Sequence, residues 1–195
     1  KIGFALIVPG KFMDPRLITS LIDSPPTGIE SQIRINFSMV LNLLLSHRPD
    51  EIRRLLEQSF AAHLRKKTAA RKDPITRDHL WGQFRHHLNF LKAHGYIDEN
   101  DRLTEDGLWA SKLRVDQPLL IAEGFRRNVF PADNPALLAA MVAAFVNERE
   151  FATAGFRATL APGLETAFDS LVAALRPLTV DLQQYHFEVR PLYLM

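Results

Sequence analysis

The sequence predicts a mainly helical protein. Apolar residues recur at helical spacing along most of the chain after residue 32, and several of these stretches open with proline or acidic residues that favour a first helical turn. A single stretch, residues 2–8, has the continuous apolar pattern that is typical of a buried strand. With 195 residues, of which 47% are apolar and 24% charged, the chain is long enough for one globular domain or two small ones.

The N-terminal region differs from the rest. Ile2–Val8 is closed by Pro9 and Gly10 and predicts a strand, and Asp23–Gly28 is a proline-rich linker. The sequence offers this strand no obvious partner nearby, so we expect its sheet to lie upstream of Lys1 and both ends of the chain to be cuts through structured regions. Residues 1–28 are therefore predicted to be a leftover strand and linker of an upstream domain.

Three helices and a hairpin are predicted next. The helices cover Ile33–Leu45, about 49–64 and Leu80–His94, and a basic loop separates the last two. In the third helix an apolar arc predicts the core, formed by Leu80, Trp81, Phe84, Leu88 and Leu91. Gly95 suits a helix C-terminal cap, Tyr96–Ile97 can pair with Leu103, and Thr104 can cap a short helix. This order is typical of a winged-helix domain, which we place at residues 29–115.

Residues 116–195 predict part of an α-helical bundle. One helix starts near Pro118, a second starts at Pro135 with Asp133 or Asn134 as its cap, and a third covers Leu164–Leu175. The longest apolar stretch, Ile35–Leu45, is about half as long as a membrane span and is interrupted by Asn36, Ser38 and Asn42, so we expect no membrane partner.

The chain lacks recognisable catalytic motifs. The Gly-Lys pair in VPGKF has Ala5 and Phe12 where a phosphate-binding loop needs glycine and Ser or Thr. Five of the seven histidines lie between His63 and His94, but their spacing of seven residues does not suit helix-borne metal ligands. We therefore expect no catalytic residue, no metal site and no cofactor in this chain. The absence of cysteine fits a reducing cytoplasm.

A local excess of positive charge is the clearest functional pattern. Residues 61–94 hold eight Lys or Arg against Asp73 and Asp78. Such a segment can contact a phosphate backbone, and it can equally be a solvated loop. The candidate nucleic-acid-binding residues are Arg65, Lys66, Lys67, Arg71 and Lys72, followed by Arg85 and Lys92.

Two features indicate that neither the wing nor the third helix reads duplex DNA. The wing, residues 98–106, carries five acidic residues against Arg102 and would be repelled by phosphates. On the third helix, Phe90 projects roughly opposite the apolar arc, while His86 and Asn89 take the most open positions. We therefore expect this helix to be wedged between two packed bodies, as in a scaffold.

Several stretches resemble one family, the superkiller-like, DExH-type branch of the DEAD/DEAH-box RNA helicases. SQIRINFSMVLNLL and EQSFAAHL resemble the region after its second motor domain. FLKAHGYIDENDRLTEDGLWASKL resembles its winged helix, and LLIAEGFRRNVF and PALLAAMVAAFV resemble the start of its C-terminal helical domain. KIGFALIVPGKF is similar to the strand after its last motor motif.

The resemblance implies an accessory part of an ATP-dependent RNA or DNA helicase. Its partners would be single-stranded nucleic acid and the upstream motor domains of the same polypeptide, which would bind ATP and Mg. We expect the channel-lining last helix of the bundle beyond Met195. Two alternatives stay open: a free-standing winged-helix transcription regulator, which would bind duplex DNA, and a protein-interaction module, which would expose an apolar patch on the bundle.

Overall fold

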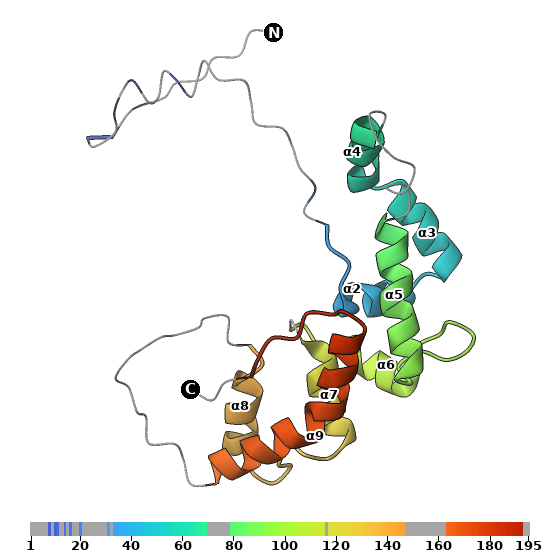
Figure 1. Ribbon diagram of the computed structural model, residues 1–195. Helices are drawn as coiled ribbons and strands as arrows, with labels where there is room; N and C mark the ends of the chain where they lie inside the picture. The colour runs from blue at the N-terminus through green and yellow to red at the C-terminus, as the bar shows by residue number, and fades with distance from the viewer. Residues whose placement is uncertain are drawn as a thin grey trace. The chain divides into compact units, whose positions relative to one another are not determined.

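The structure is a computed structural model. It describes residues 8, 10, 11, 14, 16, 20, 31, 33–69, 79–115, 117–146 and 163–192, with only the backbone described for 65–69. The chain divides into two units, Lys1–Gln32 and Ile33–Met195, and every helix discussed below belongs to the second (Figure 1). The strand predicted at residues 2–8 falls, except for Val8, outside the described residues and stays a prediction.

The first helices are shorter than predicted. Helix α2 is Phe37–Leu44 and starts later than Ile33, because the side chain of Asn36 accepts a hydrogen bond from the Met39 N–H and caps the helix there. The single helix predicted at about 49–64 is wrong. Two helices, α3 (Pro49–Glu57) and α4 (Phe60–Ala69), replace it. Between them the Ser59 hydroxyl accepts from the Ala62 N–H, which starts a new helix.

The middle of the unit follows the prediction closely. Helix α5 is His79–Ala93, and Gly95 adopts a left-handed φ of 74° just after it. Ile97 and Leu103 form an antiparallel bridge, which is the predicted hairpin contact. The Thr104 side chain accepts from the Gly107 N–H and caps α6, Glu105–Ala110, as expected.

The C-terminal helices are α7 (Pro118–Arg126), α8 (Pro135–Ala143) and α9 (Leu164–Gln184). The cap of α8 is Asn134, since its side chain accepts from the Leu137 N–H. Helix α9 runs well past the predicted end at Leu175 and contains Pro177. It continues because Leu178 and Leu182 are buried in the core, which compensates for the backbone hydrogen bond that proline cannot donate.

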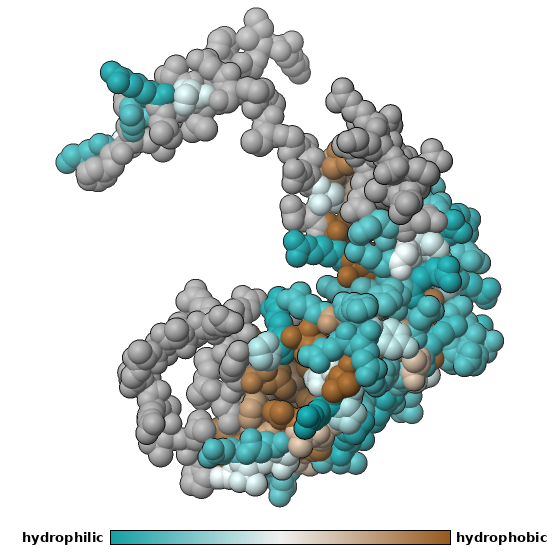
Figure 2. All heavy atoms as spheres, viewed as in Figure 1, coloured by the Kyte–Doolittle hydropathy of each residue, from teal (hydrophilic) through white to brown (hydrophobic). Residues whose placement is uncertain are grey.

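One apolar core connects these helices. It runs from Val40 and Leu41 of α2 through Phe84 and Leu91 of α5 to the buried leucines of α9. Helix α7 packs on both α6 and α9, and α8 packs on α9. Figure 2 shows hydrophobic side chains gathered over the lower part of this unit, around α7 to α9, with hydrophilic ones around α3 and α5.

The mainly helical fold is confirmed: eight helices lie in the described parts of the chain, where the only β-pairing is the Ile97–Leu103 bridge. The winged-helix assignment and the domain limits at 28 and 115 remain predictions.

Candidate nucleic-acid interface

The first three candidate residues lie on a helix and not in a loop. Arg65, Lys66 and Lys67 occupy the second half of α4, whose backbone continues to Ala69. Arg71 and Lys72 lie outside the described residues. Helix α4 packs on α3, and Figure 1 places it at the end of α5 away from α6. The structure thus puts the start of the basic segment on a regular element.

Arg85 and Lys92 lie on α5 in different settings. Arg85 is exposed. The ammonium of Lys92 lies 2.7 Å from a carboxylate oxygen of Asp101 at the tip of the hairpin, so its charge is partly balanced. The two residues are therefore not equivalent candidates, and Lys92 has the weaker case because a phosphate would compete with Asp101 for it.

The acidic turn also has structural roles. One carboxylate oxygen of Asp98 accepts hydrogen bonds from the backbone N–H groups of Asn100 and Arg102, at 2.9 and 2.8 Å. Asp101 takes a left-handed φ of 60° in the same turn. Part of the acidity that seemed functional in the sequence therefore shapes the hairpin.

Helix α5 is wedged, as predicted. Its apolar arc is buried, apart from a partly buried Trp81, and Phe90 on another side is also fully buried. The cover over Phe90 comes from this chain: the rings of Phe37, Tyr185 and Phe187 have centroids 5.4, 5.2 and 5.2 Å away. The second body is thus the start of α2 and the segment that follows α9.

Histidines contribute to this aromatic cover. The His87 ring lies 4.8 Å from Phe37 and 4.7 Å from Phe187, and its Nδ1 is 2.7 Å from the Gln83 carbonyl oxygen. Burial lowers the pKa of His87. Burial also lowers the pKa of His94, although the nearby Asp181 carboxylate opposes that shift. No group of three potential metal-binding His, Cys, Asp or Glu residues occurs in the described part of the chain.

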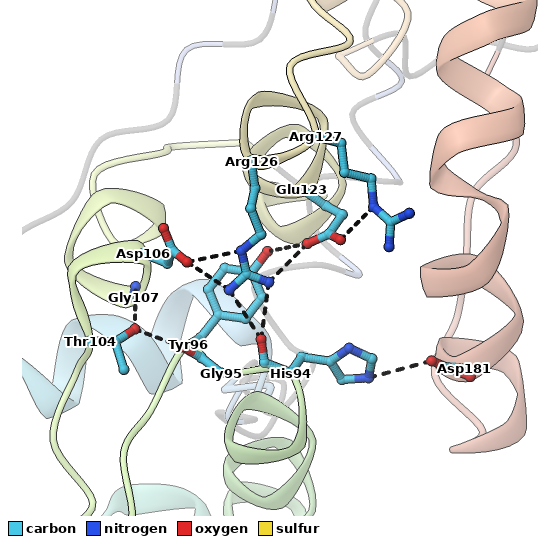
Figure 3. Close-up of polar contacts among 10 residues, drawn as sticks. All are labelled: His94, Gly95, Tyr96, Thr104, Asp106, Gly107, Glu123, Arg126, Arg127 and Asp181. Carbon is cyan, nitrogen blue, oxygen red and sulfur yellow. Dashed lines mark hydrogen bonds and ion pairs between the residues drawn. The ribbon is translucent and has the colours of Figure 1, made fainter.

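A polar cluster centred on Arg126 joins α5, the hairpin, α6 and α7 (Figure 3). Its guanidinium donates to one carboxylate oxygen of Asp106 through Nε and Nη2, at 2.9 and 2.7 Å. It also donates to the His94 carbonyl oxygen at the end of α5, at 3.1 and 3.2 Å. Its carbon Cζ lies 4.6 Å from the centroid of the Tyr96 ring. One side chain thus ties four consecutive elements together. We call this cluster the Arg126 joint.

Glu123 completes the Arg126 joint and is only 7% exposed. It accepts from Arg127 Nε at 2.7 Å, from Arg126 Nη1 at 3.1 Å and from the Tyr96 hydroxyl at 3.4 Å. Burial disfavours the ionised carboxylate, but the hydrogen bond from Arg127 and the charge of Arg126 outweigh it, so the pKa of Glu123 is lowered. Burial and the Glu123 charge raise the pKa of the Tyr96 hydroxyl, so Tyr96 remains a neutral donor.

Close backbone approach at Gly107 is a further part of the joint. A Cβ added at Gly107 would collide with the Tyr96 carbonyl oxygen, which accepts from the Thr104 N–H at 3.1 Å. Only glycine lets α6 come so near the hairpin. Sequence reasoning missed the Arg126 joint, because its members are up to 32 residues apart. The one available signal in the sequence was Glu123, an acidic residue inside the apolar start of LLIAEGFRRNVF.

Residues 100–191 match the DSHCT (NUC185) domain family, a domain found in DExH-type, superkiller-like helicases. The match spans just under half of the chain and includes Asp106, Glu123 and Arg126 of the joint. A comparison with curated proteins found no match. None of the helices in the described ranges is long and apolar enough to span a bilayer.

Proposed function

We propose that this chain is an accessory part of an ATP-dependent RNA or DNA helicase of the superkiller-like, DExH class. It braces the motor domains of the same polypeptide and helps to guide single-stranded nucleic acid. The observation that carries the proposal is the DSHCT match at residues 100–191, on a body whose upstream helices α4 and α5 bear part of the basic segment.

The Arg126 joint gives the bracing role a physical basis. It holds the end of α5, the hairpin, α6 and α7 together through charged hydrogen bonds around a nearly buried carboxylate. Charge-assisted bonds of this kind are stronger than neutral ones and fix orientation. A rigid body of this sort can present a constant surface to the motor domains.

In the proposed parent helicase, ATP and Mg bind to the motor domains. Hydrolysis of ATP supplies the energy for translocation there. The residues of this chain have a positioning role: the cations of α4 attract the strand backbone, and the acidic hairpin repels it from the neighbouring surface. We also propose that the protein acts in the cytoplasm.

The test measures fluorescence anisotropy of this chain with labelled single-stranded RNA, single-stranded DNA and duplex DNA at several salt concentrations. We expect single-strand binding that weakens steeply with salt. Replacing Arg65, Lys66 and Lys67 with Ala should reduce the slope of log affinity against log salt by about 2, because each phosphate contact to a single strand contributes about 0.7.

The matched control removes three other exposed cations, Lys112, Arg114 and Arg176, by changing each to Ala. This variant has the same net charge as the first one, so it should keep nearly the wild-type slope if contact is local to α4. Equal losses in the two variants would contradict a defined path. Sequence-dependent duplex binding would instead support the transcription regulator.

A second candidate function, a protein-interaction module, is favoured by one observation. Helix α9 exposes Val172 and Val180, and Val146 is exposed beyond α8. Exposed apolar side chains on the bundle are what this alternative predicts. Absence of nucleic-acid binding at low salt, together with a loss of partner binding in Val172→Ser and Val180→Ser, would favour it over the helicase proposal.

A further inference from the structure

Phe60 is the most exposed Phe, Tyr or Trp side chain in the described part of the chain, at 47%. Its orientation follows from its neighbours. The next residue, Ala61, is buried, and the Ser59 hydroxyl fixes the start of α4 by donating to the Leu56 carbonyl oxygen at 2.7 Å. Helix α4 therefore turns a methyl group inward and the aromatic ring outward.

The sequence that surrounds Phe60 is basic. Residues 58–72 contain five Lys or Arg and no acidic residue. The nearest acid, Glu57, forms an ion pair with Arg53 at 2.8 Å. An exposed ring among cations is the combination that binds single strands, because bases stack on the ring while phosphates lie beside the cations.

Among the described residues, the three other exposed Phe, Tyr or Trp side chains have acidic neighbours. Trp109 lies on α6 after Glu105 and Asp106. Phe125 lies two residues from Glu123, and its ring centroid is 5.0 Å from that of Trp109. Tyr185 lies between Asp181 and Glu188 in the sequence. Each of these rings would bring a strand close to a carboxylate, so Phe60 is the best-placed ring.

The spacing along α4 suits an extended strand. His63 is exposed one turn after Phe60, and Lys67 is the residue four positions further along the helix. Seven residues of α-helix rise about 10 Å, which is roughly the length of three stacked nucleotides at about 3.4 Å each. A base on Phe60 would therefore place a phosphate within reach of the basic half of α4.

We infer that the face of α4 marked by Phe60 and His63 binds single-stranded nucleic acid, with one unpaired base stacked on the Phe60 ring. The inference rests on the proposed function. It adds a stacking contact to the bases, which does not depend on the nucleotide sequence. Duplexes are disfavoured at this face, because their bases are already stacked on one another.

The experiment compares the 195-residue chain with Phe60→Leu and Phe60→Trp by anisotropy at fixed salt. The probes are a labelled single-stranded oligonucleotide and an abasic oligonucleotide of equal length and charge. Leucine keeps the apolar bulk and loses the aromatic face. We expect Phe60→Leu to weaken binding of the base-containing probe about five- to tenfold, to leave the abasic probe unchanged, and Phe60→Trp to retain wild-type affinity.

Leu55→Ala is the control, since Leu55 is similarly exposed on the neighbouring α3; it should leave both affinities unchanged. Circular dichroism of each variant establishes that the fold is retained. Equal weakening of both probes, or no weakening of either by Phe60→Leu, would overturn the stacking contact. The proposed function survives that result if neutralising Arg65, Lys66 and Lys67 still weakens binding. If the wild-type chain binds no strand at low salt, both fail.

Discussion

The two groups of positive charge in this chain are chemically alike but have opposite environments. On α7, Arg126 and Arg127 are surrounded by acceptors: the carboxylates of Asp106 and Glu123 and the carbonyl end of α5. On α4, the cations lie in a stretch without any acidic residue. The first group is satisfied inside the fold, and we propose that the second binds the phosphates of a partner strand.

The difference teaches that counting charges along the sequence does not separate structural from functional cations. Asp106 is 20 residues from Arg126, so its partner role appears only in three dimensions. A paired guanidinium contributes to stability through its hydrogen bonds, whereas an unpaired one contributes to long-range attraction of polyanions. Of the three predictions below, the second tests this division directly, and the other two test the packing and the ionisation of the fold around it.

The largest effect should come from the steric part of the Arg126 joint. Gly107→Ala places a methyl group against the Tyr96 carbonyl oxygen, so α6 must move away from the hairpin. We expect the free energy of unfolding to fall by about 2–4 kcal/mol, as for other overpacking changes in tightly packed positions. Urea-induced unfolding followed by circular dichroism measures it.

Gly82→Ala is the matched control for that change. Nothing lies within 4 Å of a Cβ at Gly82, which is in the interior of α5. Alanine is a better helix former than glycine, so this variant should gain about 0.5–1 kcal/mol. Similar effects of the two substitutions would contradict the close approach at Gly107.

Removing charge should separate the two groups. Arg126→Met leaves the His94 carbonyl oxygen and Asp106 without their donor and Glu123 with Arg127 as its remaining cation, so we expect a loss of about 2–3 kcal/mol in stability. Lys66→Met should change stability by less than about 0.5 kcal/mol. Under our proposal, Lys66→Met should nevertheless weaken the binding of single-stranded nucleic acid.

The two variants are compared by denaturant unfolding and by anisotropy on the same samples. Binding by folded Arg126→Met should stay close to wild type, because the cations of α4 are unaffected. A large loss of stability in Lys66→Met would mean that α4 has a buried acidic partner, and the comparison between the two groups would then fail.

Local signals in the sequence predicted the helix ends that depend on one residue. Gly95 and Thr104 act as caps where expected, because their roles need only their immediate neighbours. The passage of α9 through Pro177 was missed for the opposite reason, because it depends on which side chains the core buries, and burial is decided by the whole fold. The break at Ser59 has a local cause, the hydrogen bond from the Ala62 N–H to the Ser59 hydroxyl, and was missed although that signal was present in the sequence.

The candidate site was predictable to a similar degree. The basic segment is visible in composition alone, and the wedged position of α5 followed from the placement of Phe90 opposite the apolar arc. The pairing of Lys92 with Asp101 and the Arg126 joint were not predictable. In both cases the residues in contact are not neighbours in the sequence, so only the folded structure brings them together.

The smallest predicted effect concerns pH and extends the comparison to a group that ionises near neutrality. Burial lowers the pKa of His87 below 6.5, so the folded chain binds fewer protons there than the unfolded chain. The stability that this group contributes is therefore present above about pH 6.5 and decreases as the pH falls through that value toward the lowered pKa. The carboxylate of the joint should not change in the same window, because the pKa of Glu123 is lowered and it stays ionised.

His87→Phe tests this prediction, since it keeps a ring against Phe37 and Phe187 and cannot titrate. Thermal unfolding at pH 7.5 and pH 5.5 should show a smaller drop in Tm for this variant than for wild type. We expect the two drops to differ by less than about 4 °C, the shift that 1 kcal/mol produces in a domain of this size. His79→Phe, at the exposed start of α5, should keep the wild-type pH dependence. If His79→Phe flattened it as much as His87→Phe, the pH response would come from the surface and not from the aromatic cover of α5.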